Sequence, residues 1–241
     1  MIKFKNAFGV KKIENFFSNQ EIKNIISQVK ILIEHRDKKD FIWKFYEKNK
    51  KLNRIEYFVN HSEFFLKLSK SSKILNELTK LYSEEFVLFK DKINFKYPGG
   101  LGFEPHQDIS AGWGRYTNFQ ISIAIPLADT TIENGAIEFG PKLIEMRTNF
   151  HEDLNEDFDY NHITTNLGDI ILFDSYVPHM SNINNSEYER PILFFTYTFK
   201  KDGFYYEKYH SDKFKVVPPD IYKIKGKKYR SGNSNNKAIF E

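Results

Sequence analysis

Cysteine is absent from the 241-residue sequence, which excludes disulfides, thiolate nucleophiles and cysteine-ligated zinc. Any metal site must therefore use histidine and carboxylate ligands. No apolar run is long enough to cross a bilayer, and the N-terminal residues lack the apolar core of a secretory signal. The net charge of +4 is too small to indicate nucleic-acid binding, and no patch interleaves basic with aromatic residues. We therefore expect a cytoplasmic protein that has neither a nucleic acid nor a membrane as its partner.

Sequence patterns with helical spacing dominate the first 85 residues. Ser18 and Glu21 have the spacing of a capping box, and apolar residues every three or four positions predict a helix to about His35. Residues 41–60 alternate weakly, as one or two strands would, and residues 61–85 again have helical spacing. We expect these helices to cover a sheet from outside.

From Phe86 onward the spacing changes to that of β-strands. Polar and apolar side chains alternate along residues 86–97, so one face would carry Lys90, Lys92, Asn94 and Lys96. Alternating or apolar segments predict further strands at 119–127, 136–139, 170–173 and 191–199. Residues 145–162 are polar and acidic, which is typical of a long loop or lid, and residues 200–241 show no periodicity.

These patterns predict a single domain over residues 1–241. Its length and its hydrophobic content of 40% are sufficient for one sizeable core. Within the domain we expect a mostly helical support at residues 1–85, a barrel core at 86–200 and a C-terminal extension at 201–241.

Two short motifs on predicted strands can supply metal ligands. In Phe103-Glu-Pro-His-Gln-Asp108, His106 and Asp108 are two residues apart, and an extended backbone would turn both side chains to one face. His179 follows the predicted strand at 170–173 and offers a third ligand. Two histidines and one carboxylate with open positions opposite form the facial triad of non-haem Fe(II) oxygenases. A His-x-Asp pair alone is common by chance, so the prediction depends on the segments around it.

Arg190 opens an apolar strand shortly after His179. An arginine there either reaches out to water or binds an anion, and its guanidinium matches a carboxylate in bidentate geometry. An Fe(II) oxygenase that chelates a 2-oxoacid needs such a cation for the far carboxylate, with a hydroxyl such as that of Ser181 beside it. Ligands on two separated sets of strands suggest a double-stranded β-helix, a jelly-roll or cupin-like barrel. The predicted fold class is mainly β with flanking helices (α+β).

Taken together, these stretches resemble the phytanoyl-CoA dioxygenase-like family of Fe(II)- and 2-oxoglutarate-dependent oxygenases, in its ectoine hydroxylase-like branch. The matching segments cover most of the chain to about residue 200: residues 8–17, 92–100, 105–108, 133–139, 168–173 and 179–181, with Arg190. The resemblance implies an enzyme that uses Fe(II), 2-oxoglutarate and O₂ to hydroxylate a C–H bond of a small metabolite or natural-product intermediate. Succinate and CO₂ would be released.

The resemblance also implies a role for each matching residue. The Fe(II) ligands, which are also the catalytic residues, would be His106, Asp108 and His179. The residues that bind the co-substrate would be Arg190, Ser181, Asn94, Gln107 and Lys92.

The chain departs from the family pattern in one segment. Relatives usually read Pro-Gly-Ser-His where this chain reads Gly140-Pro-Lys-Leu143, which puts the substrate contacts of that segment in doubt. Asp108 favours hydroxylation, because related halogenases replace this carboxylate with a small residue and so open a coordination position for halide. Trp113, Tyr116 and the 145–162 loop are candidates for the substrate pocket or its lid.

Two other functions fit parts of the pattern. A metal-dependent isomerase or hydrolase on a cupin-like barrel would use the same ligands with zinc or manganese, but it would have no use for Ser181 and Arg190. A barrel that binds a metabolite without turnover would gain nothing from an open metal site. We expect a small-molecule substrate, for which the lysine-rich C-terminal segment favours an anion. The sequence leaves both a monomer and a homodimer open.

Overall fold

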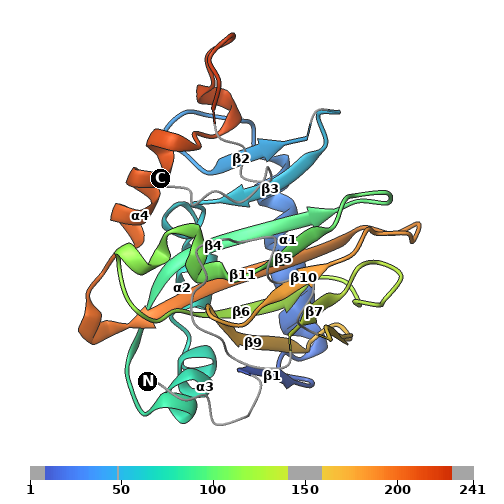
Figure 1. Cartoon of the computed structure of the whole chain (residues 1–241), viewed down its shortest axis with the longest axis vertical. Coiled ribbons are helices and arrows are strands. Elements are labelled where there is room, and N and C mark those ends of the chain that lie inside the picture. The colour runs from blue at the N-terminus through green and yellow to red at the C-terminus, as the bar shows by residue number, and fades with distance from the viewer. Residues whose placement is uncertain (1–8, 48, 141–158, 230–241) are drawn as a thin grey trace.

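Two antiparallel sheets pack face to face in the computed structural model, which describes residues 9–47, 49–140 and 159–229 (Figure 1). The larger sheet has seven strands, in the spatial order β1 (Val10–Ile13), β9 (Ile170–Asp174), β6 (Ile121–Pro126), β11 (Arg190–Phe199), β4 (Phe86–Lys96), β3 (Leu52–Glu56) and β2 (Trp43–Tyr46). The smaller sheet has four strands, in the order β5 (Phe103–His106), β10 (His179–Ser181), β7 (Ile137–Phe139) and β8 (Asn161–Ile163). Two such sheets with flanking helices are the predicted jelly-roll architecture.

Helices α1 (Asn19–Glu34), α2 (Glu63–Ser69) and α3 (Ser72–Tyr82) cover the outer face of the larger sheet (Figure 1). The predicted capping box begins α1, because Ser18 Oγ accepts from the Glu21 backbone N–H and the Glu21 carboxylate accepts from the Ser18 N–H. The buried side of α1 and the outward-facing strand residues form one apolar core. Burial of this core is the main force that holds the helices on the sheet.

The inner face of the larger sheet is apolar over some strands and charged over others. Strand β4 alternates as predicted, because Ile93 and Phe95 enter the outer core while the inner face carries Lys90, Lys92, Asn94 and Lys96. A second apolar core lies between the sheets and is built from β1, β6, β9 and β11 of the larger sheet and β7 of the smaller one. The cations of β4 therefore lie beside an apolar interior, and not on the outer surface.

The N-terminal region contributes three strands to the larger sheet in addition to its helices. Strands β2 and β3 lie within residues 41–60, where one or two strands were predicted, and β1 was not expected. Most of the predicted 145–162 loop, and most of the departing Gly140-Pro-Lys-Leu143 segment, fall within residues 141–158, which lie outside the described residues. The last part of the predicted loop is a strand, since β8 pairs with β7.

The expectation that residues 200–241 lack regular structure is wrong for their first part. A helix, α4 (Tyr206–Val216), packs against β4. Its buried residues are Tyr209, His210 and Lys213, so it has no apolar stripe that a sequence pattern would reveal. Residues 230–241 lie outside the described residues.

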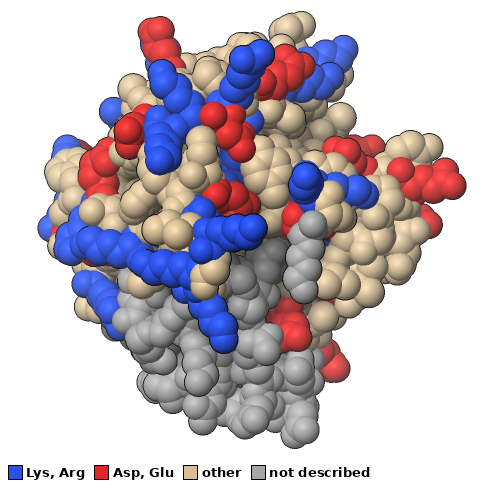
Figure 2. Space-filling model, turned by 90° about the horizontal axis from the view of Figure 1, so that it is seen from above, with Lys and Arg blue, Asp and Glu red and all other residues tan. Residues whose placement is uncertain are grey.

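Exposed charges of both signs are mixed on the surface. On the face that Figure 2 shows, Lys and Arg side chains interleave with Asp and Glu. Several exposed charges are paired, such as Lys67 with Glu63 and Lys200 with Glu85, each at 2.6 Å, and exposed pairs of this kind contribute little stability. Within the described ranges, no helix is long and apolar enough to span a bilayer.

Asp174 ends β9 with a buried carboxylate that forms no ion pair with any described residue. Its exposed fraction is 2%, and the Tyr176 backbone N–H donates to Oδ1 at 2.7 Å. Burial raises the pKa of Asp174 to about 7, and the single hydrogen bond opposes this only in part.

We expect Asp174→Asn to stabilise the protein at pH 8 and to have little effect near pH 4. The folded protein holds the Asp174 proton more tightly than the unfolded chain does, so the wild type loses stability as pH rises from its usual pKa of 3.8 to about 7. Asparagine does not titrate, and its Oδ1 still accepts from Tyr176. The gain in free energy of unfolding is at most about 4 kcal/mol. Denaturant unfolding of both proteins across this pH range measures it, and equal pH dependence in the two would contradict it.

Candidate active site

The pairing of β5 with β10 brings the two predicted histidine ligands together. His106 lies opposite His179 in the register, and the centroids of their rings are 4.2 Å apart. The approach of the two strands requires glycine at position 102, because a Cβ there would lie 2.2 Å from the Ser181 carbonyl oxygen. The glycine-rich turn before β5 therefore serves the close packing of the two histidine-bearing strands.

Asp108 joins the histidines two residues after His106. Gln107 is extended, so Asp108 returns to the side of His106 before the chain enters the short 3-10 helix Asp108–Ala111. Asp108 Oδ1 lies 3.9 Å from His106 Nε2. One ligand atom from each of His106, Asp108 and His179 lies within 4.8 Å of the other two. The structure thus brings together the trio that the sequence predicts, called the histidine trio below.

Each imidazole of the trio has one nitrogen fixed by the backbone. His106 Nδ1 lies 2.8 Å from the Glu104 carbonyl oxygen, and His179 Nδ1 lies 2.9 Å from that of Val177. A carbonyl only accepts, so Nδ1 carries the proton in both rings and Nε2 keeps its lone pair. Burial lowers the pKa of both histidines, that of His106 to about 3. Both rings are therefore neutral near pH 7 and can bind a metal without losing a proton.

Asp108 supplies the negative charge of the trio. Burial acts to raise its pKa, but the neighbouring groups, His179 first and then Lys92, outweigh burial and lower the pKa below 3.8. The side chains of Asp108 and His106 are 12% and 21% exposed, so the trio can be reached from solvent. Two neutral nitrogen donors and one carboxylate oxygen are a donor set that fits Fe(II).

Arg190 is a buried cation that lacks a carboxylate partner among the residues the structure places. It begins β11, is 3% exposed, and donates from Nε to the Asn134 carbonyl oxygen at 3.5 Å. Burial lowers its pKa to about 10, so the guanidinium stays charged at neutral pH. A buried charge of this kind is costly unless an anion pairs with it. Arg190 therefore fits the binding of a carboxylate.

Lys96 is a second cation at this position, which the sequence pattern alone did not distinguish from its neighbours on β4. It lies opposite Arg190 in the register, and its Nζ donates to Ser181 Oγ at 2.8 Å and to the Asn182 carbonyl. Burial, and then Arg190, lower the pKa of Lys96 to about 7. Lys96, which the sequence left unassigned, therefore contacts Ser181 and lies opposite the predicted arginine in the register.

The other predicted co-substrate residues occupy different places. Asn94 lies on the inner face between Lys92 and Lys96 and is half-buried. Gln107 is fully buried and donates from Nε2 to the Tyr176 carbonyl oxygen at 2.7 Å. Lys92 lies over the Phe194 ring, with Nζ 4.6 Å from the centroid. Asn94 and Lys92 therefore face the interior between the sheets, whereas Gln107 is held by the backbone.

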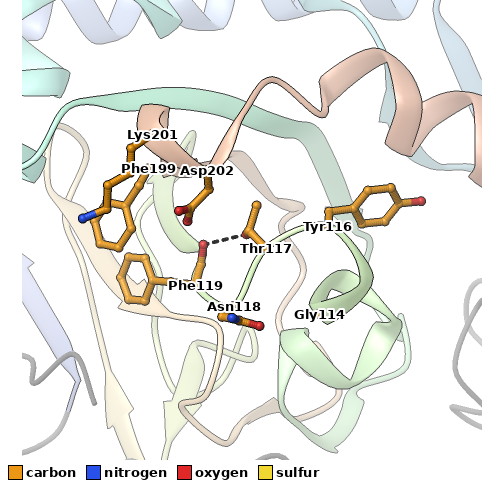
Figure 3. A pocket seen from close by; sticks show the side chains of 8 residues that line it. All are labelled: Gly114, Tyr116, Thr117, Asn118, Phe119, Phe199, Lys201 and Asp202. Atoms are coloured by element: carbon orange, nitrogen blue, oxygen red, sulfur yellow. Dashed lines mark hydrogen bonds between the residues drawn. The ribbon is translucent and has the colours of Figure 1, made fainter.

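The two aromatic candidates for the substrate pocket, Tyr116 and Trp113, differ in whether they line a surface hollow. Tyr116 lines a surface hollow of about 400 Å³ that includes none of the histidine trio (Figure 3). Its hydroxyl donates to Asp212 at 3.1 Å. Trp113 is 2% exposed and packs against Phe89 and Lys90. The residues that line the hollow include none of the trio, whereas Trp113 lies against Lys90 of β4.

Comparison with known proteins identifies relatives of this chain. The sequence profile of the phytanoyl-CoA dioxygenase (PhyH) family matches residues 6–192. The 2-aminoethylphosphonate dioxygenase of the uncultured bacterium HF130_AEPn_1 is 34% identical over 190 residues, which cover 76% of this chain and 72% of that protein. The methylphosphonate hydroxylase of Gimesia maris is 34% identical over 168 residues, which cover 66% of this chain and 64% of that protein.

A solved structure has the same fold as this chain. EctD from S. alaskensis, determined with 2-oxoglutarate and 5-hydroxyectoine, superposes with a TM-score of 0.68. It is 19% identical, and the match covers 81% of this chain and 74% of that one. At this identity the likeness establishes the fold alone, and the predicted double-stranded β-helix is confirmed.

We expect the binding of 2-oxoglutarate to weaken as pH rises above about 7, the pKa of Lys96. Protonated Lys96 adds a positive charge beside Arg190, so above that pH Lys96 must take up a proton when the anion binds. The apparent Kd then rises by up to about tenfold per pH unit. Anaerobic titrations with Fe(II) present measure this, and Lys96→Met should bind weakly with a flat pH profile. A wild-type profile as flat as that of the variant would contradict the expectation.

Proposed function

The chain belongs to the phytanoyl-CoA dioxygenase family and is an Fe(II)- and 2-oxoglutarate-dependent dioxygenase, and we propose that it hydroxylates a carbon atom of a small organophosphonate. Two relatives at 34% identity are a 2-aminoethylphosphonate dioxygenase and a methylphosphonate hydroxylase. Phosphonates are compact anions, and buried cations lie beside the histidine trio on the inner face of β4. Both observations favour a phosphonate over a neutral substrate.

The observation that carries the proposal is the convergence of His106, Asp108 and His179. We assign these residues as the Fe(II) ligands, because two fixed Nε2 lone pairs and one carboxylate oxygen approach a common point. This donor set leaves coordination positions for the co-substrate and O₂. Asp108 as the carboxylate ligand favours hydroxylation over halogenation, as argued from the sequence.

We assign the far carboxylate of 2-oxoglutarate to Arg190, with Lys96 and Ser181 beside it. Arg190 and Lys96 are buried cations that face each other across β11 and β4, and neither pairs with a carboxylate in the described chain. The far carboxylate of the bound co-substrate would supply the negative charge that both cations lack. Guanidinium binding of a carboxylate in bidentate geometry also fixes its orientation, so the reacting end is directed away from Arg190.

Bound Fe(II) and 2-oxoglutarate supply the oxidation, which converts O₂, 2-oxoglutarate and a C–H bond into succinate, CO₂ and an alcohol. The residues of this chain contribute placement. The Nδ1–H bonds to backbone carbonyls hold both imidazoles in one orientation. The rings of Phe139 and Phe173 lie against His179, with centroid distances of 6.0 and 5.0 Å, and exclude water from that side.

Buried Arg190 also separates this function from the isomerase or hydrolase alternative. A zinc or manganese enzyme with the same trio has no need of an unpaired cation in the interior. Such a cation destabilises the fold unless its anion is bound. The oxygenase accounts for both Arg190 and the trio, whereas the alternative accounts for the trio only.

The direct test of the co-substrate assignment is anaerobic titration of the Fe(II)-loaded protein with 2-oxoglutarate. We expect the wild type to develop the weak visible charge-transfer band of the chelate. Arg190→Met should bind Fe(II) normally but need about 10- to 100-fold more 2-oxoglutarate, since it loses a charge-assisted pair. Arg190→Lys keeps the charge without the bidentate geometry and should fall between them.

Controls distinguish loss of the site from loss of the fold. His179→Ala should lose both Fe(II) binding and the band while keeping its circular dichroism. Lys67→Met, a change at an exposed ion pair, should behave as the wild type. A wild type that binds Fe(II) but gives no band with saturating 2-oxoglutarate would refute the proposed arrangement of the site. Succinate release in the presence of organophosphonates then tests the substrate class.

A further inference from the structure

A second group of buried cations lies on the inner side of β3 and β4. Glu56 of β3 is fully buried at its centre. Its Oε1 lies 3.0 Å from Arg54 Nε and 3.8 Å from Lys90 Nζ, and Lys213 of α4 donates a hydrogen bond to its Oε2. Burial acts to raise the pKa of Glu56, but these cations hold it well below its usual range. One carboxylate therefore serves three cations.

Lys92 adds a fourth cation, and it makes no ion pair with any residue that the structure describes. Its contact with the Phe194 ring removes water from the ammonium but does not neutralise it. Burial, and then the neighbouring Lys90, lower its pKa to about 8. The nearby carboxylate of Asp108 is assigned to the metal and is not available as its partner. The side chain of Lys92 is half-buried, and an uncompensated cation between the two sheets is costly, which is typical of functional sites.

Lys92 acts electrostatically on the proposed site of oxidation, since its charge lowers the pKa of all three residues of the histidine trio. The indole Nε1 of Trp113 is buried and has no hydrogen-bond partner in the described chain, and Lys90 Nζ lies 5.3 Å from the centroid of that ring. Lys92 and Trp113 Nε1 are both donors, so neither can satisfy the other, and the group that would satisfy both is an acceptor.

We propose that Lys90 and Lys92, supported by the charge of Arg54, bind the PO₃ group of the substrate and hold its carbon atoms at the metal centre. A phosphonate offers three acceptor oxygens and up to two negative charges, which match an excess of cationic donors. The inference rests on the proposed function and names the residues that would recognise its substrate.

The co-substrate does not compete for these lysines. Lys92 and Lys96 are four residues apart on β4, which is about 13 Å along a strand. Lys96 pairs in register with Arg190, whereas Lys92 pairs with Phe194. One anion can therefore bind at each end of the inner face of β4, with the half-buried Asn94 between them. Lys92, which the family resemblance implied for 2-oxoglutarate, is thereby assigned to the substrate.

The test uses the protein loaded anaerobically with Fe(II) and 2-oxoglutarate, with methylphosphonate as the probe. Methylphosphonate has only one carbon atom besides its PO₃ group. Its binding therefore reports on the PO₃ site, whatever the rest of the natural substrate is. It should perturb the visible band of the wild type. In Lys92→Met the apparent Kd for methylphosphonate should rise about 10- to 100-fold, while the Kd for 2-oxoglutarate stays the same. Lys67→Met is the matched surface control, and Lys92→Arg, which keeps the charge, should retain binding.

A stability measurement separates binding from folding. Because Lys92→Met removes an unpaired, half-buried cation, its Tm should equal or exceed that of the wild type. Equal methylphosphonate affinity in Lys92→Met and wild type would overturn the inference and leave the oxygenase intact. So would a wild type whose band responds to acetate as strongly as to methylphosphonate, or a folded Lys92→Arg without binding. Absence of the band itself would instead remove the proposed function, and this inference with it.

Discussion

The antiparallel pairing of β4 with β11 determines where Arg190 and the lysines of β4 lie in the active site. Its register places Lys96 opposite Arg190 and Lys92 opposite Phe194. Because β4 alternates, its apolar residues enter the core under the helices and its lysines turn toward the space between the sheets. A shift of one residue would exchange these faces, so the core under the helices and the active site depend on the same register.

Some of the charged side chains between the sheets are paired with a charge of opposite sign, and others are not. Glu56 gathers Arg54, Lys90 and Lys213 around one carboxylate, whereas Lys92 and Arg190 have no carboxylate in the described chain. In a protein that bound nothing, apolar residues at these positions would give a more stable fold. The arrangement is reasonable for an enzyme that binds two anions at once, since 2-oxoglutarate and a phosphonate would supply the charge that the chain omits. We expect the protein without these anions to be less stable, because the cations then have no partner.

Much of the fold and the metal trio could be predicted from the sequence, because both depend on local patterns. The capping box at Ser18, the alternation of β4 and the spacing of His106 and Asp108 all act within a few residues. The roles of Lys92 and Lys96 could not be separated, because they differ only in the residues that β11 places opposite them. Helix α4 was missed because its buried face is polar, and its contact between Lys213 and Glu56 joins residues far apart in the chain. Such contacts leave no periodic signal.

The central claim is that buried cations beside the histidine trio select a fully charged phosphonate. The most direct measurement compares the binding of 2-aminoethylphosphonate with that of its monomethyl ester to the anaerobic complex of wild-type protein, Fe(II) and 2-oxoglutarate. The ester keeps the carbon skeleton but loses one negative charge and one terminal oxygen. We predict that it binds at least about tenfold more weakly, in proportion to one charge-assisted hydrogen bond. Equal affinity for the two compounds would contradict the account.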